Sequence, residues 1–214
     1  MTDAIEPLFR LIGARVAVFG YGADARAQAL ALHRCGNTVT LAVPPGASAD
    51  RALADGFAAA PAPRAVDGAS VIVIALPHDE HPATFWRACT AQVVPAALVV
   101  YRSGLAVEAG MFDPPGTDVV VIANHGDAFR IAVHRDGTGR ALVRAIAYAR
   151  AAFGEAITVD GSTVAAEIDL ELAAVGERVS GVFALLGQAP ARPTDEPEPS
   201  TTDRPSVVLL RSLR

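Results

Sequence analysis

Short apolar runs alternate with alanine-rich stretches along most of the chain. The apolar runs, rich in valine and isoleucine, lie at residues 16–19, 38–43, 71–76, 97–101, 118–123 and 131–134. Continuous runs of this kind are typical of strands buried on both faces of a parallel sheet. Apolar residues at helical spacing fill the stretches between them, most clearly at 47–57, 84–89 and 140–152. The pattern predicts an α/β protein with a doubly wound, mostly parallel sheet and helices on both faces.

The pattern changes near residue 156. A short strand at 156–159 precedes a long helix over about 164–186, and residues 188–205 then hold five prolines among polar residues. Such a composition is typical of an extended or disordered linker. The last residues recover an apolar run, which predicts either a strand added to a sheet edge or a frayed terminus. We therefore divide the chain into a domain at 1–160, a helix at 161–187, a linker at 188–205 and a terminal segment at 206–214.

A glycine turn joins the first strand to the first helix. Gly20, Gly22 and Ala25 form a GxGxxA pattern, and the helix ends at Gly36-Asn37 before the second strand. The first glycine permits the tight turn, the second lets a phosphate approach the backbone, and the small third residue lets the helix pack on the strand. The amides at the start of such a helix bind anions. The turn predicts nucleotide binding, with a plain strand-to-helix turn as the alternative.

Composition and charge exclude several classes of function. The net charge is −5 with no basic cluster, which argues against a nucleic-acid partner. No apolar run approaches the roughly 18 residues that span a bilayer, and the first residues carry acids and no basic segment, so we expect a cytoplasmic protein without membrane partners. All 18 basic residues are arginine. Without lysine, Schiff-base chemistry on this chain is excluded.

Four sequence patches resemble one family of oxidoreductases. They are VAVFGYG at 16–22, PPGAS and ADGF within 44–57, IALP at 74–77, and IAVHRDGTGRAL with AIAYARAAFG at 131–154. Residues 15 to about 187 resemble the N-terminal domain of ketol-acid reductoisomerase, also called acetohydroxy acid isomeroreductase. The resemblance implies a Rossmann domain that binds NADPH. In the family, a knotted helical C-terminal domain with two magnesium ions completes the active site, and we expect most of that domain to be missing from this chain.

The chain departs from the family at functional positions. Ser103 stands where the family has a histidine, and Asn124-His125-Gly126 stands where it has a lysine. The family holds magnesium with an Asp and a Glu four residues apart on one helix face, but either possible alignment places Ala173 at one of the two positions. Glu167 and Glu171 also lie four apart, and we interpret them as a solvated face. We therefore expect no bound metal and no isomerase step.

The cofactor side is altered less. Pro44 replaces an arginine that the family uses for the 2′-phosphate of NADPH, whereas Ser48 remains and Arg51 can serve a phosphate. Because Ser48 and Arg51 can serve a phosphate, we expect NADP. NAD is the alternative, because Asp50 can instead reach a ribose hydroxyl. Asp24 lies in the turn itself, where a carboxylate competes with a phosphate for the same amides. We assign cofactor binding to Gly20, Tyr21, Gly22, Ala23, Asp24, Ala25, Ser48, Arg51 and Pro77.

Hydride transfer also needs a proton donor near the ligand edge of the sheet. His78 and His125 follow the third and fifth apolar runs, where the carboxyl ends of parallel strands meet, and Ser103 follows the fourth. We assign His125, His78 and Ser103 as candidate catalytic residues, the alternative being that these histidines are structural or merely exposed. A zinc site at His78 and His81 is disfavoured because prolines flank the segment and no third ligand is indicated.

Two hypotheses about function follow. The first is a reductase that transfers a hydride to a keto or imino compound without isomerisation. The second is a non-catalytic nucleotide-binding or assembly module, favoured by the loss of the family's lysine and metal positions. In either case an isolated Rossmann domain leaves the nicotinamide side open, so we expect a homodimer in which the helix at 164–186 packs against its mate.

Overall fold

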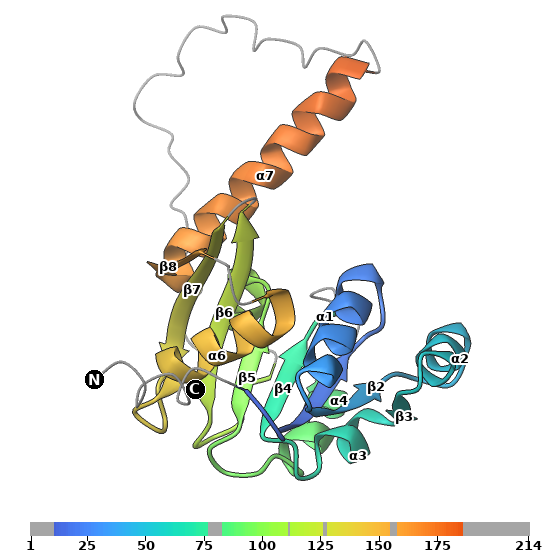
Figure 1. The fold of residues 1–214 in the computed structure, drawn as a ribbon. Coiled ribbons are helices and arrows are strands. Elements are labelled where there is room, and N and C mark those ends of the chain that lie inside the picture. The colour runs from blue at the N-terminus through green and yellow to red at the C-terminus, as the bar shows by residue number, and fades with distance from the viewer. Residues whose placement is uncertain (1–10, 77–82, 111, 126–127, 155–157, 186–214) are drawn as a thin grey trace, which may run out of the picture. The chain divides into compact units, whose positions relative to one another are not determined.

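The computed structural model describes residues 11–76, 83–110, 112–125, 128–154 and 158–185 (Figure 1). The chain consists of two compact units, Met1–Ala174 and Val175–Arg214. The first unit contains the sheet and its covering helices. The expected linker and terminal segment lie outside the described residues.

Eight strands of the described residues form one sheet in the order β3-β2-β1-β4-β5-β6-β7-β8. Their bounds are β1 Arg15–Phe19, β2 Thr38–Ala42, β3 Ala58–Ala60, β4 Val71–Ile74, β5 Leu98–Tyr101, β6 Asp118–His125, β7 Ala128–Arg135 and β8 Thr158–Ser162. The first six strands are parallel, whereas β7 runs antiparallel to β6 and β8 runs parallel to β7. The chain order reverses between β1 and β4, which is where open α/β sheets bind ligands.

Helices cover both faces of the sheet (Figure 1). The described helices are α1 Ala23–Arg34, α2 Ala47–Ala54, α3 Ala62–Val66, α4 Ala83–Thr90, α5 Gly104–Glu108, α6 Ala141–Phe153 and α7 Val164–Leu185. On one face α1, α2 and α6 pack over a core that includes Val18 and Tyr148. On the other face α3, α4 and α5 pack over Phe19, Trp86 and Phe112. The predicted doubly wound, mostly parallel fold is therefore confirmed.

Three short elements were not expected from the sequence. The strand β3 consists of three alanines at the edge of the sheet, and alanine is a poor strand former. The helix α3 carries Pro63 in its first turn, where a missing amide hydrogen costs nothing, so an expected loop is a helix. The helix α5 is about one turn long and is capped at its start by Ser103, whose hydroxyl accepts a hydrogen bond from the amide of Ala106. Within the described ranges, no helix combines the length and apolar character needed to cross a bilayer.

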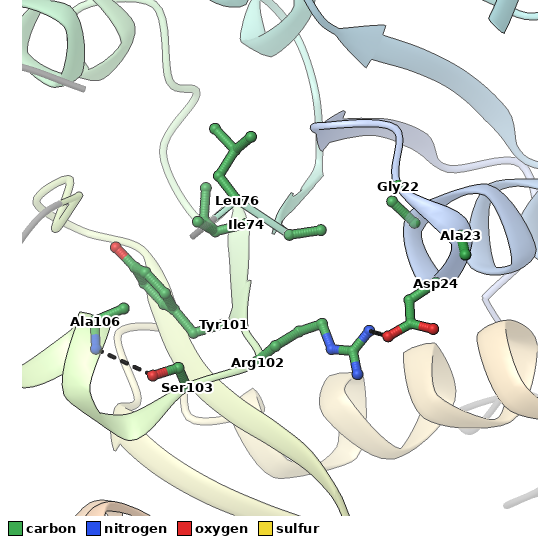
Figure 2. Close-up of a pocket in the computed structure, with 11 residues that line it drawn as sticks. Gly22, Ala23, Asp24, Ile74, Leu76, Tyr101, Arg102, Ser103 and Ala106 are labelled. Carbon is green, nitrogen blue, oxygen red and sulfur yellow. Dashed lines mark hydrogen bonds and ion pairs between the residues drawn. The ribbon is translucent and has the colours of Figure 1, made fainter. Parts of the chain in front are cut away.

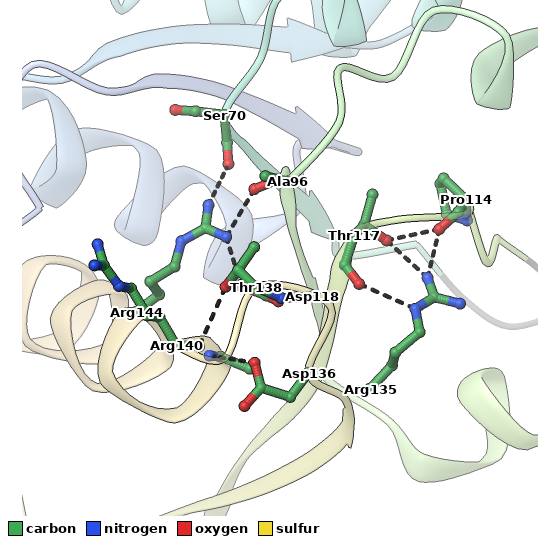
Figure 3. A network of polar contacts seen from close by, with 11 residues as sticks. Ser70, Ala96, Pro114, Thr117, Asp118, Arg135, Asp136, Thr138, Arg140 and Arg144 are labelled. Carbon is green, nitrogen blue, oxygen red and sulfur yellow. Dashed lines mark hydrogen bonds and ion pairs between the residues drawn. The ribbon is translucent and has the colours of Figure 1, made fainter.

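A buried polar network fastens α6 to the amino-terminal edge of the sheet (Figure 3). Asp118, at the start of β6, has no exposed surface. Its carboxylate accepts hydrogen bonds from Arg144 at 2.6 Å and from the Thr138 hydroxyl at 2.7 Å. Arg144 also donates to the carbonyl of Ala96 at 2.7 Å and to that of Ser70 at 3.1 Å, just before β5 and β4. One arginine therefore links the beginnings of three adjacent strands.

Candidate functional site

Three clefts lie around the glycine turn at the carboxyl edge of the parallel strands. The first, of about 440 Å³, lies between the start of α1 and the ends of β4 and β5 (Figure 2). The second, of about 610 Å³, is largely apolar and lies beside the end of β2, against Pro44 and Ser48. The third, of about 460 Å³, is lined by charged residues that include Arg26 and Arg51. Together they flank both sides of the turn between β1 and α1.

The two glycines of the turn have different structural roles. Gly20 has a φ of +85°, and a Cβ there would lie 2.9 Å from the Leu76 side chain, so both conformation and space require glycine. Gly22 has an ordinary extended conformation and caps α1 without a side-chain hydrogen bond. A Cβ on Gly22 would meet no atom within 4 Å, and its position lines the first cleft. The start of α1 therefore has open space beside its backbone amides.

Asp24 is paired across the first cleft. Its carboxylate accepts a hydrogen bond of 3.0 Å from the guanidinium of Arg102, which directly follows β5 (Figure 2). The Asp24 side chain remains 77% exposed. The carboxylate that we expected to compete with a phosphate is therefore neutralised by a cation that the sequence analysis missed. The signal available was the place of Arg102 at a strand end on the ligand edge.

Tyr21 takes part in a polar cluster on the other side of the turn. Its hydroxyl donates to Asp55 at 2.7 Å, and Arg26 donates to both carboxylate oxygens of Asp55 at 2.6 and 2.7 Å. The hydrogen bonds from Arg26 and then from Tyr21 lower the pKa of Asp55 to about 2. Burial, followed by the contact with Asp55, raises the pKa of Tyr21 to about 12. The cluster ties the end of α2 to the first turn of α1.

The structure brings Ser48 and Arg51 together on α2. Arg51 is exposed and donates a hydrogen bond of 3.3 Å to the Ser48 hydroxyl. Its Nε donates to the carbonyl of Ala47, also at 3.3 Å. Ser48 lines the second cleft and Arg51 the third, so the pair stands between the two. Both residues lie near the glycine turn, because each shares a cleft with Tyr21.

Glu167 and Glu171 do not form a solvated face, and that interpretation was wrong. Glu171 accepts hydrogen bonds of 2.7 Å from both the Ser103 hydroxyl and the Gly104 amide. Glu167 has no exposed surface and contacts the Ser162 hydroxyl and, at 3.3 Å, the guanidinium of Arg130. The first turns of α7 lie against the sheet and α5, so these carboxylates point inward. The spacing of four predicted a shared face, but the direction of that face depends on tertiary packing.

The histidine candidates are only partly placed. His125 is the last residue of β6, at the carboxyl edge of the parallel strands, and its side chain is not among those described. Pro77 and His78 lie outside the described residues. Their assigned roles stay predictions. Among the residues that the structure describes, no group of three His, Cys, Asp or Glu side chains is arranged to hold a metal ion.

Comparisons of the sequence with known proteins identify one family. A family model described as the NADPH-binding domain of acetohydroxy acid isomeroreductase matches residues 10–157. The ketol-acid reductoisomerase (NADP(+)) of Caldivirga maquilingensis is 32% identical over 203 residues, which cover 86% of this chain and 61% of the relative. That of Pyrobaculum arsenaticum is 31% identical over 202 residues, covering 86% and 60%. The chain thus spans about six tenths of the length of these curated relatives.

Solved structures show the same fold at lower identity. An NADH-preferring ketol-acid reductoisomerase from an uncultured archean has a TM-score of 0.67 and 22% identity, and the match covers 84% of this chain and 63% of that one. An imine reductase from Myxococcus stipitatus in complex with NADP+ has a TM-score of 0.58 and 18% identity, covering 80% and 63%. The family model extends over well more than half of the chain. The chain therefore belongs to the acetohydroxy acid isomeroreductase family, through the NADPH-binding domain of that family.

Proposed function

We propose that this chain is an NAD(P)H-dependent reductase that transfers a hydride to a keto or imino compound without an isomerisation step. One observation carries the proposal. The cleft of about 440 Å³ joins the open start of α1 at Gly22 to Ser103, so a nucleotide phosphate and a substrate group have places in one cavity. A bound nicotinamide cofactor would supply the hydride. The residues of this chain would bind the cofactor and orient the acceptor.

The isomerase step of the family is not part of the proposal. That step uses two metal ions to polarise a carbonyl and an alkoxide. Ala173 occupies one of the two carboxylate positions that the family uses for magnesium. The nearby carboxylates of Glu167 and Glu171 are instead hydrogen-bonded to Ser162 and Ser103. The donor set that remains therefore supports reduction better than a metal-dependent alkyl shift.

We propose NADPH as the preferred cofactor, with NADH bound more weakly. Arg51 is exposed beside the glycine turn and touches Ser48, and such a pair suits the 2′-phosphate that distinguishes NADPH from NADH. Arg26 lines the third cleft together with Arg51, but the Arg26 guanidinium is hydrogen-bonded to Asp55. Arg51 is therefore the residue on which the preference depends.

Titration with each cofactor tests the function and its cofactor together. With calorimetry as the measurement, we expect the wild-type protein to bind NADPH with a micromolar dissociation constant and NADH more weakly. In Arg51→Ala the dissociation constant for NADPH should rise by about tenfold or more, because a charge-assisted contact to the phosphate is lost. Binding of NADH should stay within about twofold, because NADH lacks that phosphate.

Arg87→Ala is the matched control, since Arg87 is an exposed arginine on α4 and lines none of the three clefts. It should bind both cofactors as the wild type does. If neither cofactor binds the wild-type protein, the reductase proposal fails and the non-catalytic module is favoured instead. If Arg51→Ala weakens NADH as much as NADPH, the 2′-phosphate assignment is wrong.

We also propose that the protein is a homodimer in which α7 packs against a second copy. The helix carries apolar side chains that are largely exposed, with Leu172 at 54% and Val175 at 49%. Exposed apolar residues on one helix favour an interface. Sedimentation at micromolar concentration should give the mass of two chains for the wild type and of one chain for Leu172→Glu. A wild-type protein that sediments as a single chain would contradict the proposal.

A further inference from the structure

We propose that the substrate class of this site is a protonated imine and that Glu171 is the specificity-determining residue that selects it. The inference rests on the proposed reductase function and concerns only the group that accepts the hydride. Its basis is the position of the Glu171 carboxylate, which the chain holds against the residues that follow β5 at the wall of the first cleft.

Glu171 is fixed by two hydrogen bonds from the segment after β5. One carboxylate oxygen accepts from the Ser103 hydroxyl and the other from the Gly104 amide, each at 2.7 Å. Ser103 lines the first cleft together with Arg102 and Gly22. The Ser103 proton is therefore directed to Glu171. The Ser103 hydroxyl oxygen lies between that carboxylate and the cleft.

Close packing between α5 and α7 keeps Glu171 in this place. A Cβ on Gly104 would lie 2.9 Å from the Ile168 side chain and 3.0 Å from the carbonyl oxygen of Val164. Only a residue without a side chain permits α7 to approach the start of α5 so closely. The first turns of α7 are therefore seated on Gly104, and Glu171 lies one turn beyond Ile168.

Among the described residues around the cleft, Glu171 carries the charge that no ion pair offsets. Asp24 and Arg102 pair with each other at 3.0 Å, and their charges cancel. Within the described part of the chain, Glu171 forms no ion pair, and its two donors, a hydroxyl and a backbone amide, are neutral. The Glu171 carboxylate therefore lies behind Ser103, one hydrogen bond away from a residue that lines the cleft.

The Glu171 carboxylate behind the cleft affects a carbonyl and an imine differently as hydride acceptors. Reduction of a carbonyl builds negative charge on oxygen, which a nearby carboxylate opposes, whereas an imine accepts hydride as its protonated cation. A carboxylate within a few ångströms favours that cation. In the reaction a hydride, with its two electrons, passes from the reduced nicotinamide to the iminium carbon, and the carbon–nitrogen π pair stays on nitrogen. The imine is reduced, the nicotinamide is oxidised, and the product amine takes one proton from solvent.

Pyrrolidine and tetrahydrofuran test the inference by binding alone, because the two rings have nearly the same shape and only pyrrolidine is cationic at neutral pH. With the oxidised cofactor bound to the full chain, we expect pyrrolidine to bind at least about tenfold more tightly by calorimetry. The preference should disappear in Glu171→Gln, which keeps the size of the side chain and removes its charge. Asp169→Asn removes an exposed charge from the same helix and should retain the preference.

Turnover gives the second readout. The protein should reduce the cyclic imine pyrroline, and the kcat/KM for this reaction should fall by about 100-fold in Glu171→Gln. The cofactor affinity and melting temperature of this variant should stay close to those of the wild type.

Equal binding of the two rings, no binding of pyrrolidine, or a preference that survives in Glu171→Gln would overturn the inference. Preferential reduction of pyruvate over pyrroline would also overturn it and leave the reductase proposal intact. If the protein binds neither NADPH nor NADH, the proposed reductase function itself is contradicted.

Discussion

Replacing Gly22 with tryptophan is expected to raise the dissociation constants for NADPH and NADH by more than about 100-fold without unfolding the protein. The backbone at Gly22 has a φ of −72° and a ψ of 179°, which any residue can adopt. A Cβ there meets nothing within 4 Å, so the new side chain extends into the open cleft and occupies the space where a pyrophosphate would lie. Calorimetric titration of both cofactors measures the loss.

Gly161→Trp is the matched control for this substitution. Gly161 lies on β8, is exposed, and also has no atom within 4 Å of a built Cβ. This variant should bind both cofactors with the affinity of the wild type, and both variants should melt within a few degrees of it. Undiminished cofactor binding by Gly22→Trp would show that the glycine turn is not the phosphate site, even if the protein is a reductase.

Replacing Asp118 with alanine should lower the free energy of unfolding by about 3–5 kcal/mol, because it leaves the donors of Thr138 and the guanidinium of Arg144, which is only 26% exposed, without their acceptor. The Asp118 carboxylate has no exposed surface and accepts from Arg144 and from both the amide and the hydroxyl of Thr138. Its loss also removes the link from Arg144 on α6 to the start of β6. Urea denaturation followed by circular dichroism measures the change.

Asp113→Ala provides a comparison at the same edge of the sheet. Asp113 forms an ion pair with Arg135 but its side chain is 45% exposed, and exposed pairs of this kind contribute at most about 1 kcal/mol. Asp118→Asn, which keeps the shape and loses the charge, should fall between the two variants. If Asp118→Ala costs no more than Asp113→Ala, the network does not hold the sheet edge together.

Long, regular patterns in the sequence were enough to predict the main elements of the fold. The valine and isoleucine runs predicted the central strands, and the pattern at 140–152 predicted α6. The elements missed are short and made of residues with weak or misleading preferences, such as the three alanines of β3 and the proline-containing turn of α3. Their formation depends on neighbouring strands and helices, which local sequence does not encode.

The candidate site was predictable only where its chemistry lies within one stretch of chain. The glycine turn is such a stretch, and its geometry follows from Gly20 and Gly22. The pairs Asp24 with Arg102 and Ser103 with Glu171 join residues that are 78 and 68 positions apart. No local pattern indicates such contacts. For the contact between Ser103 and Glu171, the available signal was Gly104, whose missing side chain permits the close approach of α7.

The network around Asp118 has a consequence for how proteins of this kind diverge. It lies at the amino-terminal edge of the sheet, and the segment at 131–154 that most resembles the family supplies two of its members, Thr138 and Arg144. Two of the departures from the family, Pro44 and Ser103, follow β2 and β5 at the opposite edge. The network that stabilises the sheet and the site that we propose for the reaction thus lie at opposite ends of the strands, so residues of the site can change without altering the contacts of the network. The amino-terminal edge of the sheet keeps the resemblance to the family, and the carboxyl edge carries differences that bear on the proposed reaction.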